Sequence, residues 1–145
     1  MSQTILCDIV SAERTLYSSA VKYIVVPADL GDVGIYPGHA PLLTLLKSGS
    51  ARLVKEDDSE ELLYISGGFM EVQSHRVILL ADFAERAGEL DEAEALAAKQ
   101  HAEEHLGSSV NDLDHNRALK ELSEAVARLK VIEQNRRTAH FVDKK

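Results

Sequence analysis

Short hydrophobic runs alternate with turn-forming residues from Thr4 to Ala81. Runs of about four to eight β-branched and aliphatic residues, bounded by Gly, Pro, Asp or Ser, are typical of β-strands. The predicted strands are Thr4–Val10, Val21–Val26, Leu42–Leu46, Ala51–Lys55, Leu62–Ser66, Phe69–Gln73 and Arg76–Ala81. Turns are predicted at Ala28–Gly34, Pro37-Gly38, Lys47–Gly49, Glu56–Glu60, Gly67-Gly68 and Ser74-His75. Because no helical segment interrupts this series, we expect an antiparallel sandwich or barrel rather than parallel βαβ units.

A helical pattern replaces the strand pattern at Gly88. Asp91 is a predicted N-cap with Glu94 three residues later, and an alanine-rich run follows to Leu106. Gly107-Ser108-Ser109 is predicted to end this helix, and Asn111-Asp112-Leu113-Asp114 opens a second one. The second helix carries apolar residues at spacings of three and four, namely Leu119, Leu122, Val126, Leu129 and Ile132. Two helices joined by a short polar turn predict an antiparallel hairpin.

The chain is therefore predicted to be α+β, with a β domain over residues 1–87 and a helical hairpin over residues 88–145. The contact face of the first helix is expected to consist mostly of small side chains, namely Ala93, Ala97 and Ala102 with Leu96 and Leu106. Small side chains bury little apolar area, so we expect a weakly held hairpin that can open.

The two predicted helices differ in charge. Residues 89–114 contain eight Asp or Glu and one Lys, a net charge of −7, whereas residues 117–145 contain eight Lys or Arg and four acids, a net charge of +4. Either the two helices attract each other, or the basic helix binds an acidic surface of a partner. The pattern leaves both interpretations open, because exposed ion pairs contribute only about 0–1 kcal/mol each.

Composition excludes several function classes. The formal net charge of −8 argues against nonspecific binding to nucleic acid or to an anionic membrane, so membrane association is expected only through a protein partner. No apolar run approaches the length of a membrane span, and Met1–Thr4 lacks a signal pattern, so we expect the chain to stay where it is made. Cys7 is the only cysteine and is expected to be a buried apolar residue.

One segment matches a metalloenzyme pattern. His101, Glu104 and His105 fit H-x-x-E-H, with both imidazoles on one helical face. A zinc hydrolase needs a third protein ligand and a cleft, and neither is evident, so exposed polar residues are the preferred interpretation. The chain also lacks a G-x-S-x-G elbow and a phosphate-binding Gly-Lys-Ser/Thr sequence. We therefore predict no catalytic residue, no metal and no cofactor.

A rigid loop is predicted over Gly34–Pro41. Pro37 fixes φ at the second position of a turn, and Gly38 tolerates the positive φ of a type II third position. Tyr36 and His39 then flank the bend, which suits a docking contact.

The chain closely resembles the epsilon-subunit family of bacterial F-type ATP synthases. The resemblance rests on long motifs that appear in family order, namely Asp8–Glu13, Gly31–Leu43, Tyr64–Gly68, Glu71–Gln73, Leu90–Ala93 and Ala102–His105. It implies an N-terminal β-sandwich bound to the gamma subunit and to the ring of c subunits, followed by a regulatory helical hairpin. Such a subunit is a non-catalytic part of the rotor. It couples proton-driven ring rotation to ATP synthesis, and its hairpin inhibits ATP hydrolysis. The implied location is peripheral, on the cytoplasmic face of the bacterial inner membrane.

The resemblance also implies roles for particular residues of the β domain. Asp32 and His39, with Tyr36 between them, correspond to the contact with the c-subunit ring. Asp32 replaces the family's usual glutamate, which keeps the charge and shortens the reach.

For the hairpin, the resemblance implies that it extends into the catalytic head in the inhibited state, and we expect the basic run Arg128, Lys130, Arg136 and Arg137 to pair there with acidic surface of the alpha and beta subunits. Some members of the family bind ATP through an Ile/Leu-Asp-x-x-Arg-Ala motif. This chain keeps Asp91 but has Glu94 in place of the arginine, so no nucleotide binding is expected. The alternative to a rotor subunit is a freestanding adaptor that binds one partner through each part.

Overall fold

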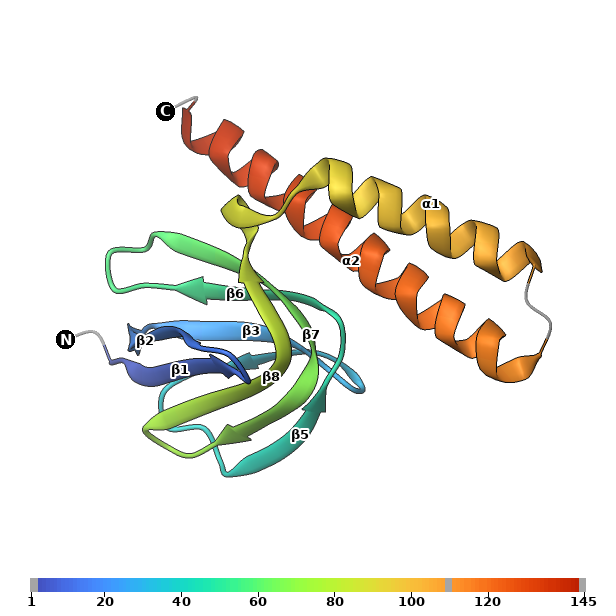
Figure 1. Ribbon diagram of the computed structural model, residues 1–145. Helices are drawn as coiled ribbons and strands as arrows, with labels where there is room; N and C mark the ends of the chain where they lie inside the picture. The colour runs from blue at the N-terminus through green and yellow to red at the C-terminus, as the bar shows by residue number, and fades with distance from the viewer. Residues whose placement is uncertain (1–2, 109–110, 144–145) are drawn as a thin grey trace. The chain divides into compact units, whose positions relative to one another are not determined.

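The computed structural model of the chain describes residues 3–108 and 111–143 (Figure 1). The chain divides into two compact units, Met1–Arg86 and Ala87–Lys145. The first unit is all β and the second is helical, so the predicted α+β class is confirmed.

The first unit has eight strands. They are β1 (Ile5–Ser11), β2 (Thr15–Val21), β3 (Tyr23–Ala28), β4 (Gly31–Ile35), β5 (Leu42–Leu46), β6 (Gly49–Val54), β7 (Glu60–Val72) and β8 (Arg76–Arg86). Their order in the sheet is β2-β1-β8-β7-β5-β3-β4, and β6 pairs with both β3 and β7. All strand pairs are antiparallel except β1 and β8, which run parallel. β1 and β8 are the first and last strands of the unit in chain order, and strands β2 to β7 lie between them in the sequence.

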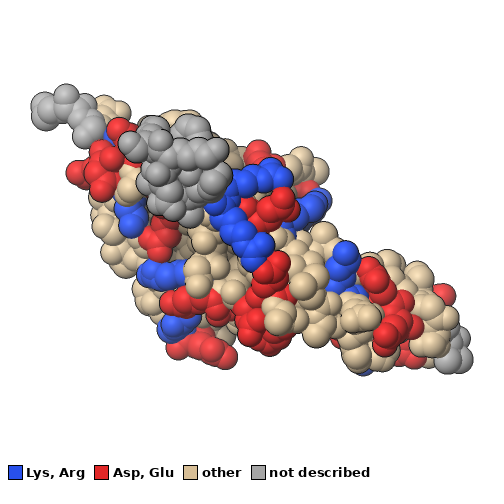
Figure 2. All heavy atoms as spheres, turned by 90° about the horizontal axis from the view of Figure 1, so that it is seen from above, with Lys and Arg blue, Asp and Glu red and all other residues tan. Residues whose placement is uncertain are grey.

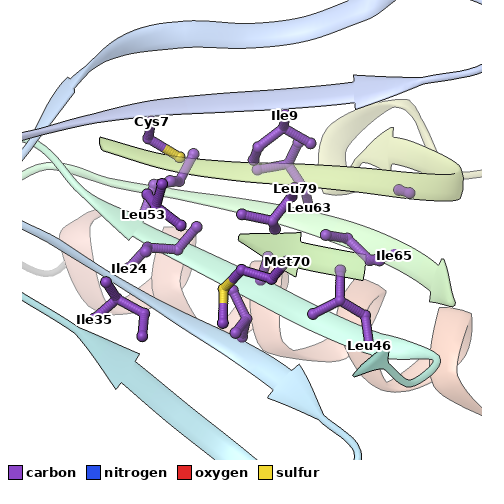
Figure 3. Close-up of a cluster of buried hydrophobic side chains, with 14 of the residues drawn as sticks. Cys7, Ile9, Ile24, Ile35, Leu46, Leu53, Leu63, Ile65, Met70 and Leu79 are labelled. Atoms are coloured by element: carbon purple, nitrogen blue, oxygen red, sulfur yellow. The ribbon is translucent and has the colours of Figure 1, made fainter. Parts of the chain in front are cut away.

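One hydrophobic core lies inside this folded sheet. Along β1, Ile5, Cys7 and Ile9 are fully buried and alternate with more exposed residues, as the two-residue period of a strand requires. Figure 3 shows side chains from several strands meeting in this core, including Ile24, Leu53, Leu63, Met70 and Leu79. Burial of these side chains is the main stabilising contribution to the unit.

Two strands were missed by the sequence pattern. β2 has an exposed polar side that includes Ser18 and Ser19, so it lacks the apolar content of a predicted strand. The turn predicted over Ala28–Gly34 was too long, because only Asp29 and Leu30 form it and β4 begins at Gly31, which pairs with Ala28. Both are end strands of the sheet order, where one side of the strand lacks a pairing partner.

Gly67-Gly68 was wrongly predicted as a turn. β7 continues through both glycines, and it pairs with β6 before them and with β5 after them. Gly68 has φ +117°, and a Cβ at this position would lie 2.1 Å from the carbonyl oxygen of Leu80. The glycine is therefore required by close approach of the neighbouring strand β8.

The second unit contains the short 3₁₀ helix η1 (Ala87–Glu89) and the helices α1 (Glu92–Ser108) and α2 (Asp112–Asp143). Asp91 caps α1, since its Oδ1 accepts the Glu94 N–H at 3.2 Å, and Asn111 caps α2 by accepting the Asp114 N–H at 2.8 Å. The predicted N-cap is confirmed. Of the predicted end of α1, Ser109 lies outside the described residues.

The two helices pack against each other as an antiparallel hairpin (Figure 1). The buried residues include Ala95 and Ala102 on α1 and Ala118 and Ala125 on α2, which we call the alanine seam. On each helix the two alanines are seven residues apart, the spacing that keeps one face toward a partner helix.

The predicted contact face was partly wrong. On α1, Ala93 and Ala97 are exposed and Leu96 is 50% exposed, whereas Ala102 is buried as expected. On α2, Ile132 is buried but Leu119 is exposed. Alanines in the seam permit a close approach of the helix axes, which leaves no space there for these leucines.

Candidate interaction sites of the two units

The loop after β4 has the predicted type II turn. The His39 N–H donates to the Tyr36 carbonyl oxygen at 3.2 Å, and Gly38 has φ +84°. The Gly38 N–H donates to the Ser74 carbonyl oxygen at 2.8 Å, which ties the loop to the turn between β7 and β8. His39 is half-buried, and its Nδ1 lies 2.6 Å from the Ala40 carbonyl oxygen. The loop is thus held by its own turn and by a second segment.

Asp32 and Tyr36 lie on one outward face of β4 and its exit. Residues two apart on a strand point the same way, and Asp32, Gly34 and Tyr36 are all exposed while Ile35 is buried. The Tyr36 ring stacks on the Tyr23 ring, with centroids 4.7 Å apart. The structure therefore places two of the three predicted ring-contact residues on the same surface, and His39 lies beyond the turn.

Sequence reasoning missed Leu30. This residue forms the tip of the turn between β3 and β4, and its side chain is completely exposed. It is separated from Asp32 by Gly31 alone. An apolar residue inside a tight turn was the available signal, since such turns favour small or polar residues.

An exposed apolar row crosses three strands of the first unit. Leu45 on β5 lies opposite Phe69 on β7, and Phe69 lies opposite Leu80 on β8. All three are about half exposed, and Leu43 on β5 is more exposed still. We call Leu43, Leu45, Phe69 and Leu80 the apolar row. The sequence signal for this row was the run Leu42-Leu43-Thr44-Leu45-Leu46. It lacks the alternation of apolar and polar residues that is typical of a strand with a solvated outer face.

The polar groups of the sheet serve its stability. Arg76 on β8 binds Asp8 on β1 through Nε at 2.9 Å and Nη2 at 2.6 Å, and the Ser18 hydroxyl on β2 donates to Asp8 at 2.5 Å. The hydrogen bond from Ser18, followed by those from Arg76, lowers the pKa of Asp8. Burial raises the pKa of the neighbouring Cys7 thiol to about 12, so this cysteine is protonated and unreactive at neutral pH.

The four basic residues expected to contact the catalytic subunits all lie on α2. Arg136 forms an ion pair with Glu92 of α1, and Arg137 binds Glu133 one turn away at 2.7 Å. Arg128 is half-buried and Lys130 is exposed. On the face seen in Figure 2, acidic and basic side chains lie interspersed. The pair between Glu92 and Arg136 favours the intramolecular interpretation of the charge difference for that arginine.

The two histidines of the H-x-x-E-H segment do meet. The rings of His101 and His105 contact edge to face with centroids 4.2 Å apart, beside a shallow pocket lined also by Asp114, Arg117 and Glu121. Over residues 3–108 and 111–143, no three His, Cys, Asp or Glu side chains are grouped so as to hold a metal ion. Within those same ranges, no helix is both long enough and apolar enough to cross a membrane.

Comparisons with known proteins match both units. Residues 4–87 match the family described as the ATP synthase delta/epsilon chain, beta-sandwich domain, and residues 89–133 match the corresponding long alpha-helix domain. The ATP synthase epsilon chain of Nitrosococcus oceani is 50% identical over 137 residues, which are 94% of this chain and 98% of that protein.

Solved structures show the same fold. A chain in the mitochondrial ATP synthase of Euglena gracilis, solved as OSCP/F1/c-ring, aligns with a TM-score of 0.78 at 19% identity, covering 86% of this chain and 78% of that one. A chain in the central stalk/c-ring structure of the Tetrahymena thermophila enzyme aligns with a TM-score of 0.58 at 12% identity, covering 92% and 97%. The two family matches and the half-identical relative lead to one conclusion: the chain belongs to the ATP synthase delta/epsilon-chain family and is an epsilon-type subunit.

Proposed function

We propose that this subunit couples rotation of a c-subunit ring to ATP synthesis through residues 1–87 and restrains ATP hydrolysis through residues 88–145. The observation that carries the coupling role is the held loop at Tyr36–His39, whose backbone is fixed by the bond from Gly38 to Ser74. A contact that transmits torque has to be stiff, and this loop keeps its shape without a partner.

The contact with the c-subunit ring is assigned to Asp32, Tyr36 and His39, together with Leu30 at the neighbouring turn. Asp32 supplies a negative charge for a polar loop of the ring, and Leu30 and Tyr36 supply exposed apolar area beside it. Tyrosine is among the residues enriched in binding hot spots, so Tyr36 is the expected main anchor of this contact.

Binding of the gamma subunit is assigned to the apolar row. Soluble proteins seldom leave a contiguous row of large apolar side chains exposed unless another protein covers it. Leu45, Phe69 and Leu80 are adjacent across paired strands, so they present one continuous apolar surface. Covering this surface by gamma would fix the β domain on the rotor.

The hairpin is assigned the inhibitory role. The alanine seam buries little apolar area, and Val131 and Ile132 are the larger buried side chains of α2, so we expect a partner to be able to shift the ratio of closed to open forms. In the closed hairpin Arg136 and Arg137 are engaged by Glu92 and Glu133. Opening releases Arg136 from α1, and with Arg128, Lys130 and Arg137 it then meets acidic surface of the alpha and beta subunits.

The remaining assignments follow the same account. The subunit performs no catalysis and needs no metal or cofactor. It binds no nucleotide, because Glu94 places a negative charge where a triphosphate needs a positive one. It binds no nucleic acid. It is peripheral on the cytoplasmic face of the bacterial inner membrane, which it reaches through the complex.

Binding to gamma tests the assignment of the apolar row, on which attachment of the β domain to the rotor depends. Phe69→Ser in the full-length chain should weaken binding to the purified gamma subunit by about tenfold or more, since the substitution removes a central apolar anchor. Leu6→Ser is the matched control, because Leu6 on β1 is equally exposed at 51% but lies outside the row. Equal loss of affinity in both variants, or none in Phe69→Ser, would contradict the assignment.

A further inference from the structure

We infer that Tyr23 and Arg52 are positioning residues that hold the Tyr36 ring in place for the contact with the c-subunit ring. This inference rests on the contact role proposed above for Tyr36.

The stack between Tyr23 and Tyr36 continues the pairing of β3 with β4. Ile24 lies opposite Ile35 in that antiparallel pair, so Tyr23 and Tyr36 come next in register. Their rings are 4.7 Å apart at an angle of 20°, a stacked arrangement. Cross-strand aromatic pairs of this kind stabilise each other's side-chain conformation.

Arg52 restrains the second ring of the stack. It lies on β6 opposite Val25 of β3, and its guanidinium carbon is 5.9 Å from the centroid of the Tyr23 ring. This distance is within the range of a cation–π contact. The Arg52 Nη1 donates to Glu60 of β7 at 2.9 Å, which fixes the guanidinium in turn. A series of contacts thus runs from Glu60 through Arg52 and Tyr23 to Tyr36.

Tyr36 depends on this support because its own surroundings are open. Tyr36 is 55% exposed, and the depression beside it is lined by Gln3, Lys22 and Pro37 besides the two tyrosines. The turn fixes the Tyr36 backbone through the bond from His39, but it does not fix χ1. With the stack, the ring loses its rotational freedom on folding, so less is lost when the partner binds.

A double-mutant cycle tests the inference, with binding of the full-length chain to purified c-subunit ring as the readout. Tyr36→Ala should weaken binding by about tenfold or more, and Tyr23→Ala by about twofold to tenfold. Since Tyr23 acts only through Tyr36, the double variant should bind no more weakly than Tyr36→Ala alone. Tyr23→Phe keeps the ring and should bind as the unmodified chain does, whereas Arg52→Gln should show a smaller loss than Tyr23→Ala.

Two controls separate positioning from general stability. Tyr17→Ala removes a tyrosine of β2 that packs against the hydrophobic core, and this variant should retain its affinity for the c-subunit ring. In the free chain, Tyr23→Ala should change the NMR ring-proton shifts of Tyr36, because the neighbouring ring current is lost.

The possible failures are distinguishable. If Tyr36→Ala binds normally, the contact role proposed for Tyr36 is wrong, and the positioning role is wrong with it. If Tyr36→Ala binds weakly but Tyr23→Ala binds normally, or if the two losses add, the positioning role alone is overturned.

Discussion

Arg136 near the end of α2 forms an ion pair with Glu92 in the first turn of α1, 44 residues earlier in the chain. The pair joins the two helices at the end of the hairpin farthest from the connecting turn. Besides the alanine seam, Val131 and Ile132 of α2 are buried toward this end of the hairpin. We expect the ion pair of Glu92 with Arg136 to act as a latch on the closed hairpin.

Glu92→Gln should open the hairpin more often. Exposed ion pairs contribute little to stability, so the ratio of open to closed forms should rise by roughly fivefold at most. Spin labels on cysteines placed at the exposed positions Gln100 and Lys120 would report the distance between the helices. The buried Cys7, with its raised pKa, should not compete for the label.

Glu133→Gln is the matched control for the latch. It removes the pair with Arg137 within α2 and leaves the pair between the helices intact. The latch is ruled out if the distance distribution of Glu92→Gln equals that of the unmodified chain, or if Glu133→Gln broadens it as much.

Gly68→Ala should destabilise the β domain by more than about 2 kcal/mol, because the new Cβ would collide with the Leu80 carbonyl oxygen and the positive φ disfavours alanine. Urea unfolding measures this directly. Gly88→Ala is the control, since a Cβ there meets no atom within 4 Å, and it should change the free energy of unfolding by less than about 1 kcal/mol. Similar effects at both glycines would contradict the close-approach explanation.

The stabilising effect of Asp8 should depend on pH. Its pKa in the folded chain is below the unfolded value of about 3.9, so its contribution to stability is present above that value and is lost as the pH falls through the folded pKa. The free energy of unfolding should therefore differ most between the unmodified chain and Asp8→Asn near neutral pH, and the difference should shrink in acid. Ser18→Ala, which removes the largest cause of the lowered pKa, should move this loss to higher pH. A difference that is constant with pH would contradict the assignment.

The isolated chain should show no micromolar ATP binding in calorimetry. Glu94 is negatively charged and follows Asp91 at the start of α1, so the site repels a triphosphate. Glu94→Arg restores the basic residue of the nucleotide-binding motif and should increase the affinity. Micromolar binding by the unmodified chain would overturn this prediction.

Features set by local sequence were predicted well. The type II turn at Pro37-Gly38 and the cap at Asp91 depend on residues next to each other in the chain, so their sequence determines their geometry. Features set by distant contacts were missed. Gly68 is required by Leu80 on another strand, and β2 is a strand because it pairs with β1 despite its serines.

The interaction sites divide in the same way. The roles of Asp32 and Tyr36 were predicted from a sequence motif, and the alternation of side chains along β4 puts both residues on one surface. The apolar row appears only when β5, β7 and β8 are paired in register. The charge difference between the helices left attraction between them as one of two interpretations, and the partnership of Glu92 with Arg136 follows from how the helices pack.

The most direct test of the account is ATP hydrolysis by the catalytic head assembled from its own alpha, beta and gamma subunits. The full-length chain is compared with a chain that ends at Gly88, after binding of both to gamma has been shown. The account predicts that only the full-length chain slows hydrolysis, because the inhibitory contacts lie in the hairpin. Equal hydrolysis rates with both chains would contradict the inhibitory role and leave the subunit with coupling alone.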